Sequence, residues 1–261
     1  MKELIHFAHG NGFPALCYKQ MLDDLNKRFD YCYIDRIGHN PQYPVAENWH
    51  YLVDEVIQSI RQQANQPVIG LGHSLGGVLS LLAAIEAPEL FKAVIMLDSP
   101  LLGSFKSKIV KLAKTVGIID RITPAFRTKG RRVHWSDRNQ LLNYLKSRDL
   151  FKTFSDESLE DYINFGIDLR DDGYHLRFDR HTEYQIYRTI PHTLPYYEGK
   201  LTVPTMLIYG DKSSVVTTMD VRYMKKYFNI KSFKIKGTHL FPMENPGAAA
   251  AKIIQAVDAI I

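Results

Sequence analysis

Cysteine is scarce in this chain, because only Cys17 and Cys32 occur among its 261 residues. One falls in an expected helix and the other in an expected strand, so the sequence offers neither a disulfide framework nor the ligand spacing of a metal site. Long apolar runs are also missing, and no stretch approaches the roughly 18 residues that a membrane-spanning helix needs. No secretory signal pattern follows Met1. These absences predict a soluble, cytoplasmic protein.

Positive charge is concentrated in one part of the sequence. The net charge of the chain is only +5, but residues 101–150 hold twelve Lys and Arg against three Asp and Glu. No recognised nucleic-acid-binding motif accompanies this charge, so we expect no nucleic-acid partner. Within it, a basic cluster of four residues could attract an anionic substrate, although the pattern favours a solvated surface; its members are Arg127, Lys129, Arg131 and Arg132.

Short apolar runs alternate with helical patterns in the first hundred residues and again after residue 200. The expected strands lie within 3–10, 30–38, 67–74, 92–100, 203–211 and 232–239. This alternation predicts an α/β fold with a mostly parallel central sheet and helices on both faces. Residues 101–200 lack the alternation and read as helices. We therefore expect a core of 1–100 and 201–261, with 101–200 as a helical insert.

A serine between glycines follows the third expected strand. Gly72-His73-Ser74-Leu75-Gly76 fits Gly-x-Ser-x-Gly, with an apolar strand before it and a helix after it. On a sharp strand-to-helix turn a serine hydroxyl projects above the sheet edge, where side chains two residues away on either side would collide. A phosphate-binding glycine turn is the alternative, but this context favours Ser74 as a nucleophile.

A nucleophilic serine needs a base and donors for the oxyanion. Among ten histidines, His239 is the only one that follows the last expected strand and precedes the last helix, so we predict it as the base. The backbone N–H of Leu75 is one expected oxyanion donor. Asn11, in the glycine turn after the first strand, is the other, unless that turn merely connects strand and helix.

Three motifs follow the expected strands in order: HG at 9–10, GHSLGG at 72–77 and GTHLFPMENP at 237–246. With these motifs the chain resembles the α/β-hydrolase family over its whole length. The resemblance implies a Ser, acid, His triad in that chain order. Within this family, a serine nucleophile is consistent with esterases, lipases, thioesterases, lactonases and C–C bond hydrolases. In this family an insert at residues 101–200 usually forms a lid over the nucleophile.

Two aspartates compete as the triad acid. Many relatives carry the acid three residues beyond the glycine that follows the later strand, but here that position is Ser213, and Asp211 is the only nearby carboxylate. Asp98 follows an earlier strand, as in some esterases of the family. We favour Asp98, with Asp211 as the alternative. A capping or turn role for Asp98 is the structural alternative.

The insert contains an amphipathic helix. Apolar residues recur at helical spacing at Phe105, Ile109, Leu112, Val116 and Ile119, with lysines elsewhere. Such a helix could lie on a membrane surface. The pattern is more typical of a lid helix that packs its stripe on the core, and we predict that arrangement.

These observations predict a lidded serine hydrolase that cleaves small-molecule carboxylic esters through an acyl-enzyme, with Ser74, His239 and Asp98 as its triad. No metal or organic cofactor is implied. A thioesterase or C–C bond hydrolase on the same triad is the first alternative. The second is a non-catalytic ligand-binding protein on a hydrolase fold.

Overall fold

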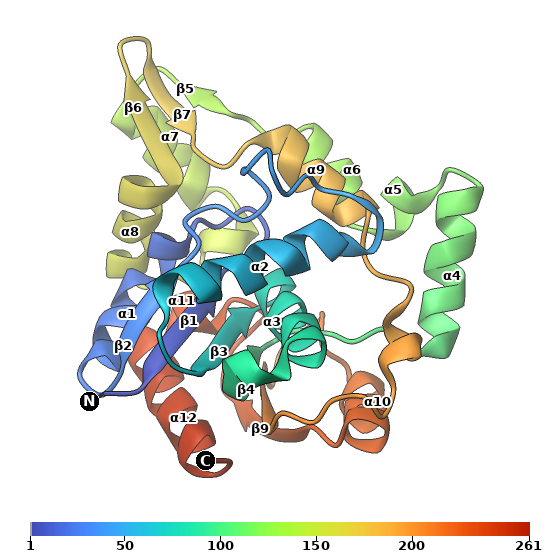
Figure 1. Ribbon diagram of the computed structural model, residues 1–261. Coiled ribbons are helices and arrows are strands. Elements are labelled where there is room, and N and C mark those ends of the chain that lie inside the picture. The colour runs from blue at the N-terminus through green and yellow to red at the C-terminus, as the bar shows by residue number, and fades with distance from the viewer. Residues whose placement is uncertain (1) are drawn as a thin grey trace.

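Six strands form one sheet through the middle of the molecule (Figure 1). The computed structural model describes residues 2–261. The strand order is β2-β1-β3-β4-β8-β9, and every neighbouring pair is parallel. The strands are β1 (Leu4–Ala8), β2 (Asp30–Tyr33), β3 (Val68–His73), β4 (Phe91–Leu97), β8 (Thr205–Gly210) and β9 (Lys231–Ile235). The predicted α/β fold with a mostly parallel sheet is confirmed.

Helices cover both faces of this sheet, because alternate side chains along each strand enter different apolar clusters. On β4, Ile95 and Leu97 join the cluster of α1, α11 and α12, whereas Val94 and Met96 join the cluster of α2, α3 and α10. The bounds of these helices are α1 (Lys19–Asn26), α2 (His50–Gln63), α3 (Leu75–Glu86), α10 (Thr218–Phe228), α11 (Phe241–Glu244) and α12 (Pro246–Asp258). No helix within residues 2–261 is long and apolar enough to cross a membrane.

The segment between β4 and β8 contains helices and a small second sheet. Its strands pair antiparallel in the order β5-β7-β6. The expectation of a wholly helical insert missed this sheet, because strands of two to four residues are too short to show alternation. The elements are α4 (Ser104–Thr115), α5 (Ile119–Ile122), α6 (Ala125–Lys129), β5 (His134–Trp135), α7 (Arg138–Lys146), α8 (Asp156–Gly166), β6 (Ile167–Arg170), β7 (Gly173–Leu176) and α9 (Arg180–Arg188).

Helix α4 presents its apolar stripe to solvent, so the predicted packing of that stripe on the core is wrong. Phe105 is 75% exposed and Leu112 is 63% exposed, and only Ile119 of the predicted stripe is buried. The face that packs inward instead carries Ser107, Val110 and Ala113. Helical periodicity shows that a helix has an apolar side, but small residues on another side can make the closer contact.

Candidate active site

Ser74 occupies a one-residue turn between β3 and α3. Its backbone dihedrals are φ 51° and ψ −113°, a combination that costs a non-glycine residue conformational energy. The Ser74 N–H donates to the carbonyl of Leu97 at 2.9 Å, which holds the turn against β4. A Cβ on Gly76 would lie 1.9 Å from the carbonyl oxygen of Ala8, and one on Gly72 would lie 2.3 Å from the Gly76 oxygen. Only glycine fits at both positions.

His239 contacts Asp98 beyond the carboxyl ends of β9 and β4. The His239 Nδ1–H donates to Asp98 Oδ2 at 2.7 Å. The Asp98 carboxylate is fully buried and accepts two further hydrogen bonds, from the Gly210 N–H to Oδ1 at 2.9 Å and from the Ser213 hydroxyl to Oδ2 at 2.5 Å. These donors orient the carboxylate, which in turn fixes the tautomer of the imidazole.

Asp211 accepts a hydrogen bond from the loop before His239 and does not contact the imidazole. Its Oδ1 accepts a hydrogen bond from the Gly237 N–H at 2.9 Å, two residues before His239. The structure therefore brings Asp98, and not Asp211, into contact with the imidazole. Ser213, which stands where many relatives carry the acid, is a hydrogen-bond donor to Asp98.

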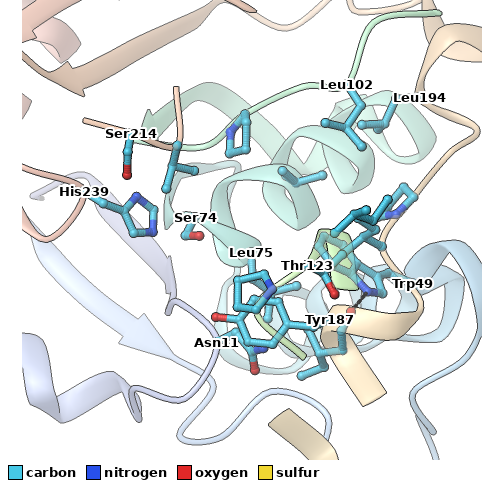
Figure 2. A pocket seen from close by; sticks show the side chains of 18 residues that line it. Asn11, Trp49, Ser74, Leu75, Leu102, Thr123, Tyr187, Leu194, Ser214 and His239 are labelled. Carbon is cyan, nitrogen blue, oxygen red and sulfur yellow. Dashed lines mark hydrogen bonds between the residues drawn. The ribbon is translucent and has the colours of Figure 1, made fainter. Parts of the chain in front are cut away.

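Ser74 and His239 both line a cavity of about 450 Å³. Figure 2 shows the imidazole beside the serine hydroxyl at one side of this cavity, with Leu102, Leu194 and Trp49 at the other. The Trp49 indole N–H donates to the Ile186 carbonyl at 3.0 Å, which fixes the ring against α9. The remaining apolar lining includes Val78, Ile122, Pro124, Ile186, Ile190, Pro191 and Val215.

The two predicted oxyanion donors lie beside Ser74. Leu75 is the first residue of α3, and the first N–H groups of a helix have no intrahelical partner. Asn11 follows β1, lines the same cavity, and donates from its side-chain Nδ2 to the Glu183 carbonyl at 3.0 Å. That bond fixes the Asn11 loop to α9. The positive end of helix α3 and the Asn11 loop thus both lie at the cavity that Ser74 lines.

A buried hydrogen-bond chain joins the three loops of the site and was not anticipated from the sequence. The Gly10 N–H donates to the Tyr18 hydroxyl at 3.2 Å, and this hydroxyl donates to His73 Nδ1 at 2.7 Å. The His73 Nε2–H then donates to the His239 carbonyl at 2.9 Å. Burial, aided by His239, holds the pKa of His73 well below its usual value, so the ring is neutral. The glycine loop and the histidine loop are thereby held in one arrangement.

A second, smaller cavity of about 110 Å³ also reaches Ser74 and His239. Its polar wall is Arg131, whose guanidinium donates to Glu183 Oε2 and to the Tyr162 hydroxyl, both at 2.6 Å. The prediction of a solvated basic cluster is therefore wrong for Arg131, which is largely buried, and right for its three exposed neighbours Arg127, Lys129 and Arg132. The separation of 52 residues between Arg131 and Glu183 gave the sequence no local signal of this pair.

Among the described residues, one group of possible metal ligands occurs, and none of its members lines either cavity. Ligand atoms of His134, Asp172 and His175 lie within 4.8 Å of one another on the small antiparallel sheet. His175 Nε2 and Asp172 Oδ1 are 2.7 Å apart and hydrogen-bonded, and the group is largely exposed.

Comparisons with known proteins identify the family of this chain. The model of the alpha/beta hydrolase family matches residues 7–253. An uncharacterized hydrolase of Bacillus subtilis, YugF, is 26% identical over 251 residues, covering 92% of this chain and 84% of its own. Rat monoglyceride lipase is 33% identical over 115 residues, but that match spans only 41% of this chain and 38% of the lipase.

Solved structures share the fold at low identity. An E-2-(acetamidomethylene)succinate hydrolase superposes with a TM-score of 0.78 at 19% identity, covering 99% of this chain and 92% of its own. The thioesterase domain from the curacin biosynthetic pathway gives 0.73 at 18% identity, covering 97% and 91%. The family match supports a hydrolase activity. The chain belongs to the alpha/beta hydrolase family.

Proposed function

We propose that this protein is a serine hydrolase of carboxylic esters that works through an acyl-enzyme. The observation that carries the proposal is the 2.7 Å hydrogen bond between His239 Nδ1 and the buried Asp98, at the side of a cavity where Ser74 stands on a strained turn. A serine hydroxyl becomes nucleophilic when an oriented base accepts its proton.

In the proposed reaction, the Ser74 hydroxyl attacks the ester carbonyl carbon as His239 Nε2 accepts its proton. Asp98 stabilises the imidazolium that forms. The N–H groups of Leu75 and Asn11 receive the negative oxygen of the tetrahedral intermediate. Return of the proton to the alkoxide releases the alcohol, and a water activated by His239 then hydrolyses the acyl-enzyme.

The two cavities suggest which part of the ester goes where. The larger cavity is walled mainly by aliphatic side chains and suits an acyl chain. The smaller one presents the neutralised Arg131–Glu183 pair and suits a small, uncharged polar alcohol. Residues 101–200, which supply Arg131, Ile186 and Tyr187, would act as the lid. Rat monoglyceride lipase, which is similar over part of the chain, has a name that denotes hydrolysis of a lipid ester.

Fluorophosphonate labelling tests the proposal. We expect the wild-type protein to form a covalent adduct on Ser74 and Ser74→Ala to form none. Steady-state turnover of p-nitrophenyl esters of rising acyl length, beside an acyl-CoA series, then separates ester from thioester preference. A folded wild-type protein that remains unlabelled would point to a ligand-binding protein instead. Preferred turnover of acyl-CoA or of a ring-cleavage diketone would assign the site to the alternative reactions.

A further inference from the structure

Exposed apolar side chains gather on one small region of the surface. Of the fourteen exposed large hydrophobic residues among residues 2–261, seven lie between Phe105 and Phe126. Phe105 is 75%, Leu112 63% and Phe126 72% exposed. We call the exposed side chains of residues 105–129 the α4–α6 surface. Helix α4 stands at the edge of the molecule in Figure 1, away from the central sheet. Such a concentration of exposed apolar side chains in one segment marks an interaction site.

The same region carries an excess of positive charge. Residues 101–130 contain seven Lys and Arg against one Asp, a net charge of +6, which exceeds the +5 of the whole chain. Two of these lysines pair within the protein, Lys106 with Asp220 and Lys114 with Glu47, each at 2.6 Å. The others are exposed around the apolar residues; they are Lys108, Lys111, Arg121, Arg127 and Lys129.

The α4–α6 surface continues into the larger cavity. Ile122 is 48% exposed and also lines the cavity that holds Ser74 and His239. Thr123 and Pro124 line both that cavity and a surface hollow formed by residues 120–127. Ile122 and Pro124 therefore give an acyl chain apolar contacts where this surface meets the cavity.

We propose that the α4–α6 surface docks the protein on an anionic lipid membrane. Apolar side chains surrounded by Lys and Arg are what such a membrane binds, because the side chains enter the headgroup region while the cations meet the negative surface. A second copy of this chain fits less well, since two such surfaces face to face would oppose charges of the same sign. Delivery of an acyl chain to Ser74 rests on the ester hydrolysis proposed above, whereas membrane attachment does not.

Co-sedimentation with lipid vesicles tests this docking without any substrate. The vesicles are phosphatidylcholine alone or phosphatidylcholine mixed with phosphatidylglycerol. We expect the wild-type protein to bind the anionic vesicles at least about tenfold more strongly than the neutral ones, and to lose that preference in high salt. Phe105→Ser/Leu112→Ser should lose about tenfold or more of the binding, and Lys108→Gln/Lys111→Gln should lose only the anionic preference.

Matched controls use exposed positions on other parts of the molecule. Leu169→Ser/Ile261→Ser removes two apolar side chains of similar exposure, 71% and 57%, from strand β6 and the C-terminal end. Lys146→Gln/Lys231→Gln removes two exposed lysines outside the α4–α6 surface. Both control variants should bind vesicles like the wild-type protein. All four variants should hydrolyse a soluble short-chain ester at the wild-type rate. The vesicle measurement uses no substrate, so a failure of the hydrolase hypothesis would leave the binding result intact.

Three results would overturn the proposal. One is equal binding by the wild-type protein and Phe105→Ser/Leu112→Ser. Another is binding that ignores phosphatidylglycerol and salt. The third is a wild-type dimer in light scattering that becomes a monomer in Phe105→Ser/Leu112→Ser while neither protein binds vesicles, which would assign the surface to a second copy.

Discussion

Two parts of the chain form the site. We call the sheet edge that carries Ser74 the lower side and the segment of residues 101–200 the upper side. The sheet edge holds Ser74, Asp98 and His239 by backbone strain, glycine contacts and hydrogen bonds that involve no substrate. The segment above supplies Arg131, part of the cavity wall and the exposed α4–α6 surface. Changes below should therefore alter the rate for every substrate, and changes above should alter which substrate is accepted.

The strongest separation of the two sides comes from the two aspartates. Asp98→Asn should lower kcat by about 10⁴-fold for short and long esters alike, because the imidazole loses its tautomer and its counter-charge. Asp211→Asn removes only a loop hydrogen bond and should stay within about tenfold of the wild-type rate. Steady-state kinetics on p-nitrophenyl esters measures both. The reverse ranking would reassign the acid to Asp211.

Above the serine, the largest effect should be on stability. Arg131→Met leaves the buried Glu183 carboxylate without its partner and should lower the free energy of unfolding by about 3–5 kcal/mol. Arg131→Met/Glu183→Leu removes both charges and should regain most of this loss. Urea unfolding followed by circular dichroism gives the values. A single variant as stable as the wild type would show that the pair does not secure the upper segment.

Substrate choice should respond to a change in the wall of the larger cavity. Ile190→Trp places a bulkier side chain in this cavity and should lower kcat/KM for long acyl esters by about tenfold to a hundredfold. Short esters should be affected much less, because their acyl groups stay near Ser74. A matched change outside the cavity, Ile261→Trp, serves as the control. Equal losses on short and long esters would contradict the assignment of this cavity to the acyl chain.

Buried histidines on the sheet side should make stability depend on pH. Burial lowers the pKa of His6 and of His9 to about 4, against about 6.5 in an unfolded chain. Between these values the unfolded chain binds more protons, so the free energy of unfolding should fall as the pH is lowered, by up to about 1.4 kcal/mol per pH unit for each imidazole. This stabilisation is fully present above about pH 6.5.

The contribution of one imidazole is the difference in slope between the wild-type protein and His6→Leu, measured by urea unfolding from pH 7 to 4.5. Glu55, whose pKa burial raises to about 7, acts in the opposite sense and is common to both proteins. The exposed His181→Leu is the control and should keep the wild-type slope. An unchanged slope in His6→Leu would contradict the buried, neutral state of His6.

The lower side of the site was largely predictable from the sequence, and the upper side was not. Ser74 and His239 follow strands, and the glycines around Ser74 have a steric reason that any strand-to-helix turn imposes. Asp98 and Asp211 remained alternatives because they follow neighbouring parallel strands, β4 and β8. Only the folded chain shows that the Gly210 N–H and the Ser213 hydroxyl converge on Asp98.

Features above the serine depend on contacts between distant residues. The Arg131–Glu183 ion pair joins α9 to a loop 52 residues earlier in the chain. No local sequence pattern predicts this pair. The helical spacing of apolar residues predicted the stripe of α4. That spacing does not determine which face of the helix packs on the core. Ser107 and Ala113 allow close packing on the inward face, so the larger side chains remain outside.

The conformation of Ser74 has a consequence for how this protein would respond to selection. A φ of 51° with ψ −113° costs serine about 1–3 kcal/mol, whereas glycine accepts positive φ readily. The residue that we propose as the nucleophile is therefore also a point where the native state is weakened. Laboratory evolution for heat resistance alone would favour glycine at position 74 and yield a sturdier protein without a nucleophile, so durability and turnover must be selected together.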